Sequence, residues 1–100
     1  DIHNGDSIVV RVLDFGTTSP KTFTASVASA LQGGKVEVHA DKPDGKLLGT
    51  LTAPYTGGWE KWQTVDANLN EEITGVHDLY FLFKGNQGAK LFNFDWWQFK

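Results

Sequence analysis

The segment with the most specific chemistry in this sequence combines two glycines and two tryptophans. It reads GGWEKW at residues 57–62, so Trp59 and Trp62 lie three residues apart. In a β-strand this odd spacing sends the two indoles to opposite faces, one into the core and one flat on the surface. An exposed indole suits the C–H-rich face of a sugar ring. The alternative is that both pack in the core, as large aromatic residues tend to do.

An amide and a carboxylate interrupt the aromatic C-terminal segment FNFDWWQF at residues 92–99. Asn93 carries both a donor and an acceptor, which is what pairing with neighbouring sugar hydroxyls requires. It can equally be a turn residue beside the preceding glycine-rich stretch. Asp95 is costly among aromatic residues unless it is hydrogen-bonded or bound to a metal. A structural Ca²⁺ and a hydrogen bond at a strand end are therefore its two interpretations.

Carboxylates that could hydrolyse a glycoside are not indicated. That reaction needs two acidic groups facing each other, roughly 5–9 Å apart across a cleft. Glu71 and Glu72 are adjacent with polar flanks, which is typical of a solvated turn, and nothing around Glu60 or Asp66 indicates a sheltered pocket. The sequence therefore predicts that the chain is not an enzyme.

Composition and the remaining polar residues argue against several other functions. His3, His39 and His77 are scattered singly, without the spacing of a zinc site, and the chain has no cysteine. A net charge of -3 without a cluster of Lys and Arg argues against nucleic acid. The longest apolar run is far too short for a membrane-spanning helix. We expect neither nucleic acid nor a membrane as a partner.

The elements that must position these residues are strands. One hundred residues suit a single domain, residues 1–100, and apolar alternation recurs every ten to fifteen residues without a helical pattern. The predicted class is all-β, a sandwich of antiparallel strands. The strands are expected at residues 7–15, 21–28, 35–40, 47–52, 62–67, 76–84 and 91–99.

Turn-forming residues separate these strands. Residues 42–46, with the letters KPDGK, predict a hairpin turn. Residues 76–84 are apolar on both faces, which predicts a central strand. The glycine-containing stretches at 56–58 and 85–89 each precede an aromatic segment, and loops held by a rigid sheet are where binding usually occurs.

Three motifs follow one another over residues 4–100, namely GGKVEVHADKPDGKLLGTLTAPYTGGWEKWQTV, then GVHDLYFLFKG, then LFNFDWWQF. Together they resemble a family 6 carbohydrate-binding module. The resemblance implies a jelly-roll sandwich appended to a xylan-degrading glycoside hydrolase, and hence an extracellular, secreted protein. It implies a sugar site in the loops at one end, where Trp62 stacks on a pyranose and Asn93 hydrogen-bonds its hydroxyls. Trp59 is then a flanking residue, and Asp95 matches a ligand of a structural calcium ion.

The sequence departs from the family pattern at its N-terminal end. The opening segment with EAE-like calcium ligands is absent, and Asp1, Ile2 and His3 stand where members often carry a Tyr that opposes the stacking Trp. Ser7 replaces a frequent Trp. We therefore expect a module that is incomplete at its N-terminal end, with an exposed edge beside residues 91–99. We hypothesise that a strand from elsewhere covers this edge.

These inferences combine into one functional expectation. The chain is predicted to bind a polysaccharide or oligosaccharide, with xylan or arabinoxylan as the expected ligand. It is also predicted to keep a covalently attached glycoside hydrolase near that ligand. The alternative is a structural or adhesive β-sandwich whose aromatic residues pack on a neighbouring domain.

Overall fold

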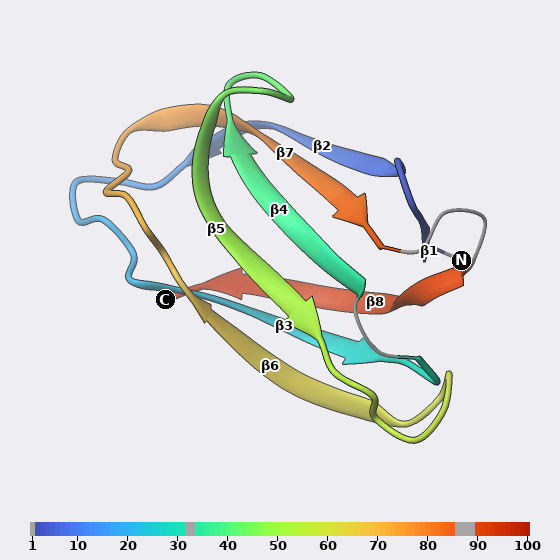
Figure 1. The fold of residues 1–100 in the computed structure, drawn as a ribbon. Helices are drawn as coiled ribbons and strands as arrows, with labels where there is room; N and C mark the ends of the chain where they lie inside the picture. Colours follow the sequence, from blue (N-terminus) through green and yellow to red (C-terminus); the bar gives the residue numbers. More distant parts are fainter. Residues whose placement is uncertain (1, 32–33, 86–89) are drawn as a thin grey trace.

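Two antiparallel sheets face each other in the structure, a computed structural model that describes residues 2–31, 34–85 and 90–100 (Figure 1). One sheet has the strand order β1-β8-β3-β6 and the other β2-β7-β4-β5. The strands of the described residues are β1 (Ile2–His3), β2 (Ser7–Asp14), β3 (Thr22–Ala28), β4 (Gly34–Ala40), β5 (Lys46–Ala53), β6 (Trp62–Asn68), β7 (Val76–Lys84) and β8 (Lys90–Phe99). This interleaved order is that of a jelly roll, which confirms the predicted all-β sandwich.

The predicted strands recur with small shifts at their ends. β7 has the predicted bounds, and the others begin or end within one or two residues of the expectation. β1 was not predicted, because two residues are too few to show an alternating pattern. It exists through pairing, since Ile2 lies opposite Phe92 and His3 opposite Lys90 of β8. The described residues contain no helix that is long and apolar enough to span a membrane.

Aromatic residues fill the space between the sheets. β7 lies inside its sheet, between β2 and β4, as predicted for a strand that is apolar on both faces. Phe81 of β7 meets Trp97 of β8 edge to face, with ring centroids 5.1 Å apart, and meets Phe23 of β3 at 5.5 Å. Phe83 and Phe92 extend this cluster along the core. Alternation along each strand thus buries the aromatic residues that join the two sheets.

The predicted hairpin joins β4 to β5. Within it Gly45 donates its N–H to the carbonyl oxygen of Lys42 at 3.0 Å, and Lys42 donates to Ala40 at 2.9 Å. A Cβ atom on Gly45 would stand 2.1 Å from the Ala40 carbonyl oxygen, so only glycine fits this position.

One edge of the first sheet is open along half of its length. β1 pairs with β8 only as far as Phe92, and no strand of the described residues pairs with the same edge at residues 95–99. The expected exposed edge is therefore present beside the C-terminal half of β8. The hypothesis that a strand from elsewhere covers it stays a prediction.

Candidate functional site

The connection from β5 to β6, residues 54–61, approaches the end of β3. Thr56 donates its N–H to the Ser29 carbonyl oxygen at 2.9 Å and accepts the N–H of Ser29 on its hydroxyl oxygen at the same distance. The chain then reverses at Gly57, whose φ of 107° is a conformation that side chains disfavour. These contacts hold the glycine-tryptophan segment against the sheet.

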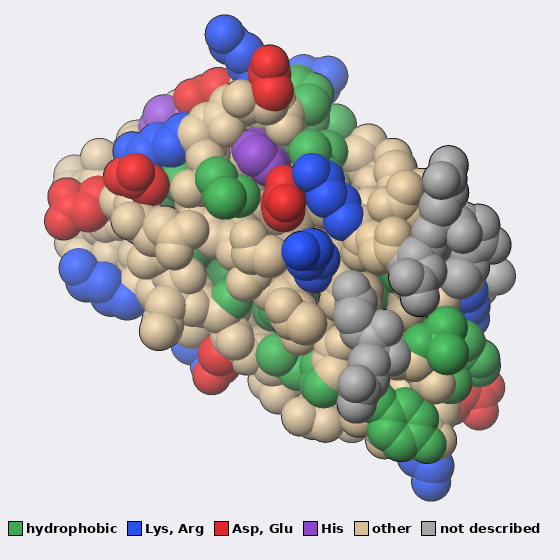
Figure 2. All heavy atoms as spheres, viewed as in Figure 1, with side chains coloured by type: hydrophobic (Ala, Val, Ile, Leu, Met, Phe, Trp, Pro, Cys, Tyr) green, Lys and Arg blue, Asp and Glu red, His purple; other side chains and the backbone are tan. Residues whose placement is uncertain are grey.

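Trp62 is the first residue of β6 and stands at the surface. Its side chain is 49% exposed, and no ring contact joins it to another aromatic residue of the described chain. Hydrophobic side chains gather at the lower right of Figure 2, where Figure 1 places the β5–β6 connection. Tyr55 within this connection and Trp62 directly after it are both exposed. An indole is therefore open to solvent at this end of the sandwich.

Strand register brings Asn93 into the same row as Trp62. Ala28 of β3 lies opposite Trp62 on one side and opposite Asn93 on the other. Residues opposite each other share a face, and the inward positions of β8 on either side of Asn93 are the core aromatics Phe92 and Phe94. Trp62, Ala28 and Asn93 thus form one row across the outer face, about 10 Å from end to end.

The side chain of Asn93 also holds the preceding turn. Its Nδ2 donates to the Trp59 carbonyl oxygen at 2.7 Å. The ammonium of Lys90 lies 4.4 Å from the centroid of the Trp59 ring, a cation–π contact. Trp59 and Asn93 therefore meet in space although 34 residues separate them. The alternative that Asn93 is a turn residue beside residues 85–89 is wrong, because Asn93 lies within β8, and the turn that its side chain holds is the one that carries Trp59.

The predicted geometry of the two tryptophans was wrong. Trp59 lies in a turn, and only Trp62 belongs to a strand, so the alternation argument does not apply to the pair. Trp59 is half-buried and Trp62 is exposed, and neither is enclosed by the core. Gly57 and Gly58 explain why Trp59 is not in a strand. Their positive φ angles turn the backbone, so extended structure resumes only at Trp62, where β6 begins.

A shallow hollow of about 360 Å³ lies beside this row, lined by residues 57–61. Trp59 is the tryptophan that lines this hollow. Trp62 and Asn93 flank it rather than line it. The other glycine-containing stretch, residues 85–89, lies outside the described residues except for Gly85.

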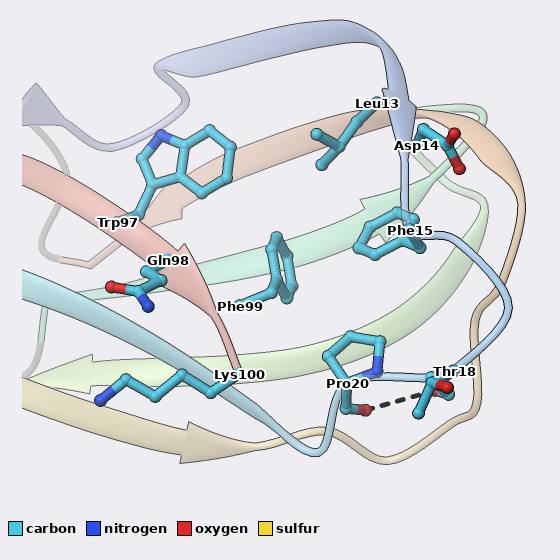
Figure 3. A pocket seen from close by; sticks show the side chains of 10 residues that line it. Leu13, Asp14, Phe15, Thr18, Pro20, Trp97, Gln98, Phe99 and Lys100 are labelled. Carbon is cyan, nitrogen blue, oxygen red and sulfur yellow. Dashed lines mark hydrogen bonds between the residues drawn. The ribbon is translucent and has the colours of Figure 1, made fainter.

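A larger cleft of about 530 Å³ lies elsewhere, between the ends of β2 and β8 (Figure 3). Leu13, Phe15, Trp97 and Phe99 line it with apolar surface. Phe15 and Phe99 meet edge to face with centroids 5.2 Å apart, so these rings pack on each other. The cleft is the open side of the core beside the unpaired half of β8. It contains none of the predicted sugar-binding residues.

Asp95 is exposed on β8. Calcium takes six to eight oxygen ligands. Among the residues that the structure describes, no three His, Cys, Asp or Glu side chains lie close enough to hold an ion. The calcium expectation stays a prediction.

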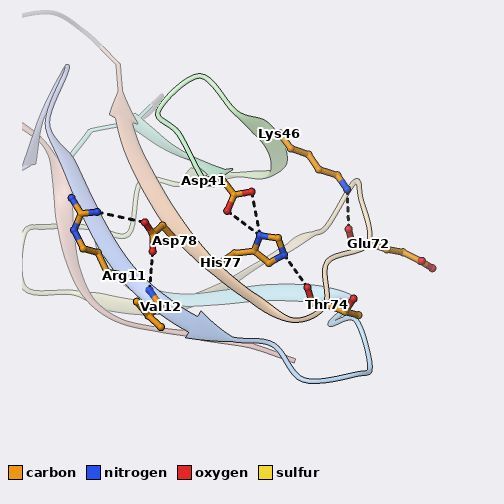
Figure 4. Close-up of polar contacts among 8 residues, drawn as sticks. All are labelled: Arg11, Val12, Asp41, Lys46, Glu72, Thr74, His77 and Asp78. Atoms are coloured by element: carbon orange, nitrogen blue, oxygen red, sulfur yellow. Dashed lines mark hydrogen bonds and ion pairs between the residues drawn. The ribbon is translucent and has the colours of Figure 1, made fainter.

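Other polar side chains form pairs that brace strands (Figure 4). His77 contacts Asp41 through Nδ1 at 2.9 Å and the Thr74 carbonyl oxygen through Nε2, also at 2.9 Å. The hydrogen bond to Asp41 raises the pKa of His77. On the outer face of β4 and β7 in the same sheet, hydrogen bonds with His39 and then Lys84 lower the pKa of Glu37.

The remaining carboxylates are also bound or solvated. Asp66 accepts a hydrogen bond from the Thr24 hydroxyl at 2.6 Å, and Glu71 and Glu72 are exposed. Glu60 lines the shallow hollow as its only carboxylate among the described residues. The larger cleft between β2 and β8 is likewise lined by a single side-chain carboxylate among the described residues, that of Asp14.

Sequence reasoning missed two members of the site. Ala28, the floor of the row, carries no chemical signal of its own. Lys90 follows a glycine-rich stretch and has no distinguishing neighbours. Both belong to the site only through strand pairing and through the fold of the Trp59 turn.

Comparisons with known proteins identify the family and support the fold. The model for carbohydrate binding module family 6 matches residues 1–100. An arabinoxylan arabinofuranohydrolase of Bacillus subtilis is 49% identical over 98 residues, 98% of this chain but only 19% of that protein. The chain thus spans about a fifth of that relative.

Two solved structures are similar along nearly the whole chain. A β-1,3-glucan-binding family 6 module from Bacillus halodurans has a TM-score of 0.91 at 35% identity, covering 99% of this chain and 72% of that one. A family 6 module from Clostridium cellulolyticum, solved with xylose, has a TM-score of 0.90 at 38% identity, covering 99% and 74%. With its jelly roll and its exposed tryptophan, the chain belongs to the family 6 carbohydrate-binding modules and is a non-catalytic, sugar-binding domain.

Proposed function

We propose that this module binds plant cell-wall polysaccharide, with xylan or arabinoxylan as its ligand, and holds an attached glycoside hydrolase close to that substrate. One observation carries the assignment of the site. The exposed indole of Trp62 lies in the same cross-strand row as the amide of Asn93, with the small Ala28 between them.

The chemistry of this row suits a pyranose. The indole of Trp62 offers a flat apolar face to the C–H groups of the ring. The Asn93 amide gives one N–H to Trp59, which leaves a second N–H and the carbonyl oxygen for sugar hydroxyls. Trp59 serves as the flanking aromatic residue, since Lys90 already covers one face of its ring.

The relatives support the choice of ligand. One is named as an arabinoxylan arabinofuranohydrolase, and another was solved with xylose. A third binds β-1,3-glucan, so a related site accepts a different β-linked backbone. Because the chain matches a small part of the arabinofuranohydrolase, we also propose that it is one module of a longer, secreted hydrolase that acts on polymer outside the cell.

Binding is expected to be weak for one module. A single stacked ring and a few hydrogen bonds exchanged with water leave a small net free energy. Linkage to a catalytic domain raises the effective concentration of substrate, so weak binding is sufficient for targeting.

The test is a calorimetric titration of xylohexaose into the wild-type chain and into Trp62→Ala. We expect the variant to lose measurable binding. Val76→Ala is the matched control, because Val76 is an exposed apolar residue at 57% on the other sheet, and it should bind like the wild type. Unchanged affinity in Trp62→Ala would refute the site. Parallel titrations with cellohexaose and with a β-1,3-glucan oligosaccharide test the choice of ligand. A further titration of xylohexaose in the presence of a calcium chelator tests the calcium prediction.

The second candidate function is a structural sandwich that packs on a neighbouring domain. The apolar cleft beside the open half of β8 favours it. Tryptophan fluorescence separates the two functions, because added xylan fragments should shift or quench the emission of an exposed sugar-binding indole. An emission spectrum that does not respond to any of the three oligosaccharides would favour packing.

A further inference from the structure

We propose that the outer face of the β6-β3-β8 sheet continues the sugar site as far as Trp96, which serves as a second stacking platform for the same polysaccharide chain. This rests on the proposed function of Trp62 and Asn93. It adds a subsite and a length requirement for the ligand.

The register of β8 turns Trp96 outward. Phe94 lies opposite Val27 of β3, whereas Trp97 lies opposite Ala25. Three steps along β8 therefore match two steps along β3, so a β-bulge places one extra residue of β8 here. Phe94 and Trp97 both pack in the core, on Phe81. Since their side chains point inward, the two residues between them point to the outer face.

Trp96 is exposed and lacks aromatic partners. Its side chain is 43% accessible, while the adjacent Trp97 contacts three phenylalanine rings. No ring contact joins Trp96 to the described residues. The solvent-exposed face of this indole is therefore accessible to a ligand.

The surface between the two indoles is small and polar. Ser26 of β3 lies opposite Thr64 of β6, one row beyond the row of Trp62 and Ala28. Both Ser26 and Ala28 are buried beneath their neighbours, so no bulky side chain of β3 separates the two indoles. The hydroxyl of Thr64, which is exposed, can bond to sugar hydroxyls.

The separation of the two platforms defines the ligand. Trp62 and Trp96 are two strands and about one row apart, which places their Cα atoms about 12 Å from each other. This is wider than one pyranose ring. A ligand that stacks on both indoles is therefore an oligosaccharide with an extended backbone, continuous with the ring held by Trp62 and Asn93.

The experiment measures affinity against ligand length. Xylobiose, xylotriose, xylotetraose and xylohexaose are titrated into the wild type, Trp96→Ala, Trp96→Phe and Trp62→Ala, with thermal unfolding as the check on folding. We expect Trp96→Ala to match the wild type for xylobiose and to lose about tenfold in affinity for xylohexaose, the factor of one modest contact. Trp96→Phe keeps a ring and should retain most of the length dependence.

Each other result has a distinct meaning. If Trp96→Ala equals the wild type at every length while Trp62→Ala loses binding, the second platform is wrong and the proposed function stands. If neither variant changes any affinity, both proposals are wrong. Should Trp96→Ala fail to fold, Trp96→Thr, with a side chain suited to strands, answers the same question.

Discussion

Trp96 and Trp97 are neighbours in the chain but belong to two different regions of the molecule. Trp97 lies between the sheets, where its ring meets Phe23, Phe81 and Phe99. Trp96 lies on the outside, where, like Trp62, it meets no other ring among the described residues. The inner rings stabilise the sandwich through contact with one another, whereas the outer indoles leave their surface free.

The comparison shows that residue type alone does not decide what an aromatic side chain does in this fold. Trp96 and Trp97 are chemically identical, and strand pairing with β3 assigns one to each face. The many aromatic residues of this small β-sandwich therefore fall into two groups. One forms the packed cluster between the sheets, and the other lies on the outer surface, where it can contact a ligand. Three predictions test this division, in order of decreasing effect.

Removing a ring from the inner cluster should have the largest effect on stability. Phe81 is fully buried and contacts Phe23, Phe94 and Trp97. Phe81→Ala should lower the free energy of unfolding by about 3–5 kcal/mol, since it leaves a cavity between the sheets. Trp96→Ala should cost less than about 1 kcal/mol in the same urea titration. An equal loss of unfolding free energy in the two variants would contradict the division between inner and outer aromatic residues.

Removing the amide that braces the outer site should have an intermediate effect. Asn93→Ala leaves the partly buried Trp59 carbonyl oxygen without its donor, at a cost of about 1–3 kcal/mol. Asn93→Asp keeps the shape but cannot donate, so we expect a similar loss. Both variants should also weaken xylohexaose binding in calorimetry. If Asn93→Asp keeps the wild-type stability, the bond to Trp59 is not what holds the turn.

A polar pair at the margin of the inner cluster, where the His77 ring lies 6.4 Å from that of Phe15, should have the smallest effect. The hydrogen bond to Asp41 raises the pKa of His77 above its usual value of 6.5. The charged imidazole thus stabilises the fold fully below that value, and the contribution is lost as the pH rises through the raised pKa. Solvent screens this exposed pair, so the effect is under about 1 kcal/mol.

The check is thermal unfolding of His77→Gln and the wild type between pH 5 and 9. The variant should be less stable than the wild type at pH 5, and the difference should shrink as the pH rises through the raised pKa, leaving only the loss of the His77 ring beside Phe15. A constant difference across this range would mean that the charge on His77 does not contribute. Ligand affinity at pH 5 should be the same in both, because His77 lies on the sheet opposite the sugar site.

The strands were predictable from the sequence because each one repeats a local pattern. β7 is apolar on both faces through residues 79–83 and was predicted with its observed ends. The hairpin after β4 was predictable because Gly45 and its neighbours set a turn locally. β1 was not, because its two residues show no pattern and depend on β8 for their conformation.

The candidate site was predictable only in part. Trp62 and Asn93 were found by residue type and by family resemblance, but the turn that holds Trp59 was misassigned to a strand. The bond from Asn93 to Trp59 joins residues far apart in the chain, and no local pattern records it.

The sequence by itself determined the all-β class, the positions of most strands and the types of residue able to touch a sugar, since these depend on alternation and side-chain chemistry. Only the tertiary structure decided that Ala28 lies between Trp62 and Asn93, and that a bulge turns Trp96 outward and Trp97 inward. The reason is physical, because the register between strands is set by the packing of both sheets together, and a shift of one residue moves every side chain to the opposite face.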